Sequence, residues 1–91
     1  MAREIEPTSR QRLLNLLRDP NRRNLARRIA EALVAVEAGP KDPGFRYRDF
    51  IGEDGLRRRL VTRYGNDEQW AIIWRDSDPV VFDYIGPAAS L

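Results

Sequence analysis

The segment Gln69–Arg75 carries apolar side chains on both of its faces, and this constrains the fold more than any other part of the chain. In an extended strand the two tryptophans and Ile72 lie on one face, while Ala71 and Ile73 lie on the other. A strand with two apolar faces is typical of the centre of a sheet, where it has a neighbour on each edge. The sequence therefore predicts a β-sheet with residues 69–75 at its centre.

Two further strands flank this segment, and each is separated from it by a turn. Residues 56–64 alternate in polarity and end at a hairpin loop, residues 65–68. Residues 80–85 follow the Asp- and Pro-containing turn at 76–79. Consecutive strands joined by short turns pair antiparallel, so we expect a three-stranded meander, with residues 45–50 as a candidate fourth strand at its edge.

Two helices precede the strands. The first begins at Thr8, which forms a capping-box pattern with Gln11, and it ends at Asp19-Pro20. The second runs from Pro20 to Ala38, with Asp19 as its N-cap, and a Gly-Pro pair follows it. Its apolar side chains share one helical face, as expected of a helix that packs on a sheet. They are Leu25, Ile29, Leu33 and Val36.

The predicted fold class is therefore α+β, with two N-terminal helices packed on a three- or four-stranded antiparallel β-meander. Residues 1–91 form one small domain, near the lower end of the usual size range. The helix pair covers one face of the sheet and leaves the other face partly open. Residues 1–7 are few and charged, so we expect no strand at the N-terminus.

The chain contains no histidine and no cysteine. This excludes catalytic triads and dyads built on those residues, a histidine general base, disulfide bonds and thiolate metal sites. Catalysis would have to use Arg, Tyr, Asp, Glu, Ser or Lys41, so the sequence favours binding over chemistry, and we expect neither cofactor nor metal. No apolar run approaches the ~20 residues of a membrane span, and the charged start does not resemble a secretory signal. We therefore expect a cytoplasmic protein without a membrane partner.

Charge is segregated along the chain. Of the 16 basic residues only Lys41 is a lysine, and the formal net charge is +2. Residues 1–30 and 57–63 are strongly basic, whereas residues 31–56 and 64–91 are acidic. Codon bias of a GC-rich genome is the plain explanation for the arginines; recognition of phosphate or carboxylate groups is the functional one. The segregation indicates a basic and an acidic face.

The sharpest candidate site is a row of arginines on the strand 56–64. Arg57, Arg59 and Arg63 share one face, with ~7 Å between alternate residues, which is close to the spacing of phosphates along a nucleic-acid backbone. Two other interpretations remain open. The row can be a solvated face balanced by nearby acids, or it can bind an acidic patch on a protein partner.

Two more groups are candidates for binding nucleic acid or a partner protein. Arg23 and Arg27 belong to a basic cluster in the first turns of the second helix, where positive charge opposes the helix dipole. Arg46, Tyr47 and Arg48 interleave guanidinium and aromatic groups before the first turn of the sheet, a pattern that fits an RNA or protein contact. An exposed solvated helix face and a loop folded over the core are the plain alternatives.

The basic second helix, the Arg-bearing strand 56–64, the strand 69–75 and the β-branched strand 80–85 together resemble the RelE/ParE toxin superfamily over residues 21–86. These are the small toxins of bacterial toxin–antitoxin pairs. The resemblance implies a sheet that begins with an N-terminal strand. In members that cut mRNA on the ribosome, it also implies basic residues with a Tyr or His near the C-terminus. Tyr84 is the last such candidate here, and no C-terminal catalytic residue is evident.

Three functions fit these features. One is a RelE/ParE-like module directed at translation or nucleic acid, either a metal-independent mRNA interferase or a non-catalytic relative. The second is a phage or mobile-element protein that binds and inhibits a host protein. The third is a nucleic-acid-binding accessory protein. The expected partners are a host or cognate protein, RNA, or both, and a homodimer remains open.

Overall fold

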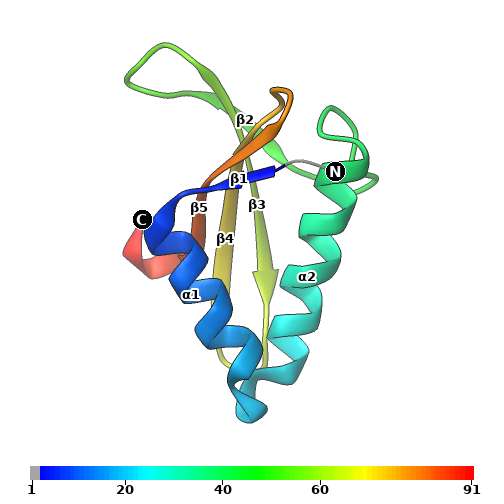
Figure 1. The fold of residues 1–91 in the computed structure, drawn as a ribbon, viewed down its shortest axis with the longest axis vertical. Helices are drawn as coiled ribbons and strands as arrows, with labels where there is room; N and C mark the ends of the chain where they lie inside the picture. Colours follow the sequence, from blue (N-terminus) through cyan, green and yellow to red (C-terminus); the bar gives the residue numbers. More distant parts are fainter. Residues whose placement is uncertain (1–2) are drawn as a thin grey trace.

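The computed structural model describes residues 3–91 as two helices against a five-stranded mixed sheet (Figure 1). The elements are β1 (Arg3–Ile5), α1 (Pro7–Arg18), the 3₁₀ turn η1 (Pro20–Arg22), α2 (Arg23–Ala38), β2 (Arg48–Ile51), β3 (Arg57–Tyr64), β4 (Gln69–Arg75), β5 (Val80–Pro87) and the 3₁₀ turn η2 (Ala88–Ser90). The strands lie in the order β1-β5-β4-β3-β2. The fold is α+β, and strands β2 to β5 form a four-stranded antiparallel meander. No helix among residues 3–91 is long and apolar enough to cross a lipid bilayer.

The expectation of no N-terminal strand was wrong. Arg3–Ile5 forms β1, which pairs parallel with the start of β5. The strand continues into α1 through Glu6, whose backbone N–H donates to the Phe82 carbonyl at 3.0 Å. Three residues suffice because Arg3 and Glu4 are exposed at the sheet edge, where charged side chains remain in water.

The helix starts also differ from the sequence prediction. Glu6, not Thr8, caps α1, because its carboxylate accepts hydrogen bonds from the backbone N–H groups of Thr8 and Ser9 at 2.9 and 2.8 Å. Asp19 caps a single 3₁₀ turn, and α2 begins only at Arg23. Its end at Ala38, before Gly39-Pro40, is as predicted.

The core lies between the helices and one face of the sheet. Trp70, Ile72 and Trp74 of β4 are buried there, so the two tryptophans belong to the core. Both indole N–H groups are hydrogen-bonded, to a Glu68 carboxylate oxygen (2.9 Å) and to the Pro40 carbonyl (3.1 Å). The opposite face of β4 is also buried, as its sequence predicted, and η2 lies against this strand.

Helix α1 covers the part of β5 that β1 does not reach. Because β1 pairs only with Val80–Phe82, the later residues of β5 lack a strand neighbour on that edge. The buried Ser9 hydroxyl accepts the Ile85 N–H at 2.9 Å, and Arg12 donates to the Ile85 carbonyl at 3.4 Å. This edge of the sheet is therefore closed, whereas the opposite edge is not.

Candidate nucleic-acid interface

A groove runs along the open edge of β3. Strand β2 pairs only with Arg57–Leu60, so the second half of β3, Val61–Tyr64, has no strand neighbour on that side. The groove has a volume of about 690 Å³. Its charged and polar lining comes from the segment before β2, from β3 and from the start of β4: Arg46, Tyr47, Arg48, Thr62, Arg63, Tyr64 and Gln69.

The groove exists because the chain before β2 turns towards the core. Phe45 and Tyr47 pack edge-on against the Trp74 ring, with ring centroids 6.3 and 5.8 Å away. The Tyr47 hydroxyl donates to the Lys41 carbonyl at 2.9 Å. These contacts draw residues 45–47 away from the line that would extend β2 along β3.

Arg46 and Arg48 carry charge that the protein does not neutralise. Both side chains are exposed, and neither forms an ion pair with any carboxylate of residues 3–91. Arg58 and Arg75 differ, because Asp83 accepts from Arg58 at 2.9 Å and from Arg75 at 3.0 Å. The groove therefore carries positive charge that no carboxylate of residues 3–91 pairs with.

Arg63 extends the groove toward α2. Its guanidinium carbon lies 4.2 Å from the Phe45 ring centroid, in a cation–π arrangement. Burial lowers the pKa of Arg63, and the nearby charge of Arg28 lowers it further, while Glu31 acts in the opposite direction. Arg28 and Arg63 line one hollow with Glu31, and an anion bound there would reduce the repulsion between the two guanidinium groups.

Arg59 does not join an exposed row with Arg57 and Arg63, as the sequence suggested. It is 7% exposed, because this face of β3 is the one that the helices cover. Its guanidinium donates to the Pro40 carbonyl at 2.8 Å and lies 3.2 Å from Asp49 and 3.4 Å from Asp76. The Nε–H is not aligned for a hydrogen bond to Asp49. Arg59 therefore holds the loop before β2 and the turn after β4 against the sheet.

Arg57 lies at the far end of β3, opposite Ile51 of β2, and is exposed outside the groove. Arg27 on α2 lies 3.9 Å from Glu31, an exposed pair that contributes little. Of the sequence candidates, the structure brings together Arg46, Tyr47, Arg48 and Arg63 and leaves Arg23, Arg27 and Arg57 apart from them.

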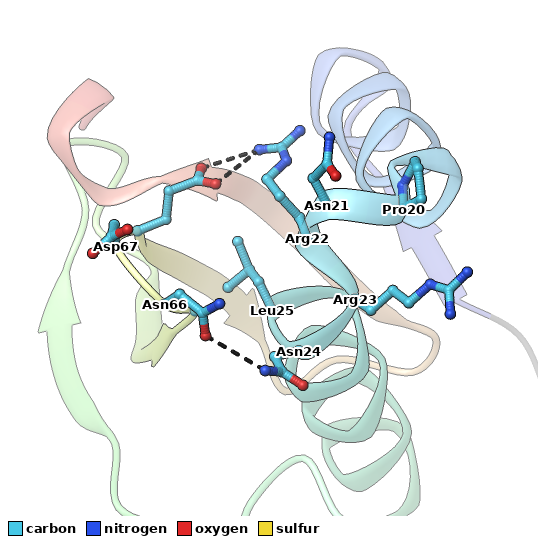
Figure 2. Close-up of a pocket in the computed structure, with 10 residues that line it drawn as sticks. Pro20, Asn21, Arg22, Arg23, Asn24, Leu25, Asn66 and Asp67 are labelled. Atoms are coloured by element: carbon cyan, nitrogen blue, oxygen red, sulfur yellow. Dashed lines mark hydrogen bonds and ion pairs between the residues drawn. The ribbon is translucent and has the colours of Figure 1, made fainter.

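A second hollow of about 430 Å³ lies between the start of α2 and the loop 65–68 (Figure 2). Arg22 donates there to Glu68 at 3.0 and 3.2 Å and also pairs with Asp19, and these contacts raise its pKa. Arg23 points away from the loop in Figure 2. Because Arg22 is already paired with two carboxylates, this hollow suits an anion less than the groove does.

The sequence interpretation missed Thr62, Tyr64 and Gln69 as lining residues and Arg28 as the neighbour of Arg63. Thr62, Tyr64 and Gln69 line the groove because β2 is short. Its four residues pair only with the first half of β3 and leave the second half open. The length of the predicted strand 56–64 against its short neighbour is the signal that could have found this edge. Nothing in the sequence places Arg28 near Arg63.

No family model, no curated protein and no solved structure matches the chain.

Proposed function

We propose that the chain is a small basic module of the RelE/ParE type that binds single-stranded RNA in the groove beside β3. The observation that carries this proposal is the group of three arginines, Arg46, Arg48 and Arg63, that line one groove without an ion pair to the described residues. Guanidinium groups bind phosphate through two parallel hydrogen bonds. Tyr64 is 58% exposed beside them and offers a ring on which a base can stack.

The arrangement of the strands supports the relation to RelE/ParE toxins. The resemblance implies an N-terminal strand that pairs into the sheet, and β1 pairs parallel with β5. It also implies a meander after two helices, which β3, β4 and β5 supply. Such a module would act in the cytoplasm on translation, as a toxin or as a non-catalytic relative of one.

Binding, not RNA cleavage, is the activity that the site supports. Tyr84, the last candidate for a catalytic tyrosine, lies on β5, and β4 separates that strand from β3. Its hydroxyl donates to the Pro87 carbonyl at 2.6 Å, and the Arg12 guanidinium lies 4.9 Å from the centroid of its ring. A general acid or base must reach the reacting atoms, and Tyr84 is not placed to reach RNA bound beside β3.

Fluorescence anisotropy with a short labelled single-stranded RNA tests the proposal. The double variant Arg46→Ala/Arg48→Ala should bind RNA about 10–100-fold more weakly, because two phosphate contacts are lost. It should also lower the slope of log affinity against log salt by about 1.4, about 0.7 for each contact removed from a single strand.

Arg10→Ala is the matched control. Arg10 is exposed on α1, which lies against β5 and not beside β3. Its replacement removes one positive charge, as does each of the two substitutions in the double variant. We expect its affinity and salt slope to stay near those of the wild type. If the wild type does not bind RNA, or if the double variant behaves like the Arg10 control, the proposed function is wrong.

A further inference from the structure

Strand β2 forms one edge of the sheet, and its outer side is unpaired. The strand order ends at β2, so its only strand neighbour among residues 3–91 is β3. All four of its residues are exposed, and the hairpin that joins β2 to β3 extends beyond the helices (Figure 1). An exposed strand edge of this kind can pair with a strand of another chain.

The hairpin determines which backbone groups face outward. The Gly52 N–H donates to the Leu56 carbonyl at 2.9 Å, so Gly52 directs its backbone groups towards β3. In an antiparallel ladder, successive residues direct these groups to opposite edges of the strand. Asp49 and Ile51 therefore direct their N–H and C=O groups away from β3, where the described part of the chain supplies no partner. Each of these two residues leaves one donor and one acceptor free on the edge.

We propose that a second copy of the chain adds to this edge, so that the two β2 strands pair antiparallel about a twofold axis and join their five-stranded sheets into one. Asp49 of each copy would pair with Ile51 of the other, and these two pairs would use all the outward backbone groups. The next twofold register would place Asp49 opposite Asp49 of the second copy, where like charges repel. In the proposed register the Asp49 carboxylate keeps its contact with Arg59 of its own chain, at 3.2 Å.

Phe50 lies at the centre of the proposed contact. It would face Phe50 of the second copy at a non-hydrogen-bonded position, where the two Cα atoms approach to about 4.5 Å and the side chains lie close together. The Phe50 side chain is on the open face of the sheet and is 39% exposed. Ile51, on the other face, is 65% exposed. Pairing would cover part of both side chains, and an aromatic pair across two strands stabilises their association.

The charges at the two ends of β2 complement each other about the same axis. Glu53 lines a hollow on the open face together with Phe50, and Arg48 shares that face because it precedes Phe50 by two residues. Neither Arg48 nor Glu53 forms an ion pair with residues 3–91. In the proposed register Arg48 lies opposite Gly52 of the second copy, which brings Glu53 of that copy beside it. A twofold axis forms this contact twice, so the edge favours a second copy over an unrelated strand.

Sedimentation velocity of nucleic-acid-free protein, over about a hundredfold range of concentration, tests the dimer. Two four-residue strands bury a small interface, so we expect a weak dimer that dissociates on dilution. Ile51→Pro should remain monomeric, because proline removes an outward N–H donor but no hydrogen bond to β3. Its circular dichroism spectrum should match that of the wild type, which shows that the variant keeps the fold.

Charge reversal tests the register independently of any effect of proline on folding. Arg48→Glu and Glu53→Arg should each weaken the dimer by about tenfold, because like charges then face each other. An equimolar mixture of these two variants should form a heterodimer, since each facing pair then has opposite signs. Arg10→Glu reverses a charge on α1, far from this edge, and as the matched control it should dimerise like the wild type.

Three results overturn the dimer: a wild type that stays monomeric at the highest concentration, single variants that dimerise like the Arg10 control, or a mixture that stays monomeric. RNA binding is measured separately, on dilute protein. Ile51 lies outside the groove, so Ile51→Pro should bind RNA like the wild type. A monomeric wild type that binds RNA refutes the dimer alone. A dimeric wild type that does not bind RNA refutes the proposed function alone.

Discussion

Arg59 shows how one side chain can support a binding site without touching a ligand. Its guanidinium contacts the Pro40 carbonyl, two carboxylates and the Tyr47 ring, whose centroid is 4.9 Å away. Tyr47 in turn forms part of the groove wall. Arg59 thus positions the segment that carries Arg46 and Arg48.

Replacing Arg59 should therefore destabilise the whole fold. In Arg59→Met, the methylene stem is roughly preserved, but the Pro40 carbonyl loses one of its two donors and the partly exposed Asp49 and Asp76 lose their cation. We expect the free energy of unfolding to fall by about 1–3 kcal/mol, mainly because a partly buried, charge-assisted hydrogen bond is lost. Urea denaturation followed by circular dichroism measures this.

Arg57→Met is the control, since Arg57 lies two residues earlier on the same strand and is exposed. Its free energy of unfolding should change by no more than about 0.5 kcal/mol. If both variants are equally stable, Arg59 does not hold the loop. A loss of RNA binding in Arg59→Met would report on this loop and not on a direct phosphate contact.

The sequence could place the arginines of β3 on one face, but it could not say which face the helices cover. Val61 shares that face and is part of the core, so its neighbour Arg59 is buried with it. Arg46, Tyr47 and Arg48 were predictable as a basic–aromatic group from their order alone. Their place beside Arg63 was not, because it depends on the packing of Phe45 and Tyr47 against Trp74.

Among the elements, the junction between β1 and α1 was the least predictable. A three-residue strand has no periodicity to detect, and it forms because β5 offers a free edge. The long elements α2, β3 and β4 were predictable because their apolar patterns extend over several residues. Glu6 lies between the two elements. Its backbone N–H continues the pairing of β1 with β5, and its carboxylate caps α1.

Glu6 should make the fold sensitive to acid. The backbone N–H groups of Thr8 and then Ser9 lower its pKa from 4.5 to about 2 in the folded state. A group whose pKa is lower in the folded state stabilises the fold above its unfolded pKa and loses that contribution as pH falls. The contribution of Glu6 is therefore complete above pH ~5 and is lost between about pH 4.5 and 2.

Acid unfolding of the Glu6→Gln variant measures this effect. Glutamine cannot ionise, so the variant should be less stable than the wild type at neutral pH. The difference should shrink as pH falls through 4.5 towards 2, because the wild-type carboxylate is then protonated. A difference that stays constant over this range would show that the charge of Glu6 does not act as the cap.

At the scale of the whole molecule, folding pairs the basic and acidic segments of the chain. Arg22 of the basic N-terminal segment meets Glu68, and Arg58 and Arg59 of β3 meet acids at or beside β5 and β4, namely Asp83 and Asp76. The segregation seen in the sequence is thus only partly cancelled in space, because other arginines of the basic segments, such as Arg18 and Arg23, form no ion pair with residues 3–91. The groove beside β3 is where basic side chains from two segments gather without such partners.

Salt should consequently affect binding and stability very differently. With three phosphate contacts to single-stranded RNA, an increase from about 50 to 200 mM salt should weaken binding about 20-fold, because fewer counterions are released. The thermal midpoint should move by no more than about 2 °C over the same range. The partly buried pairs of Arg58 and Arg59 are weakly screened, and the exposed pairs contribute little to stability.

Anisotropy and thermal denaturation in matched buffers measure the two quantities. A midpoint that falls steeply with salt would mean that the ion pairs dominate the stability of the fold, and a salt-independent affinity would mean that RNA binding does not depend on the groove arginines.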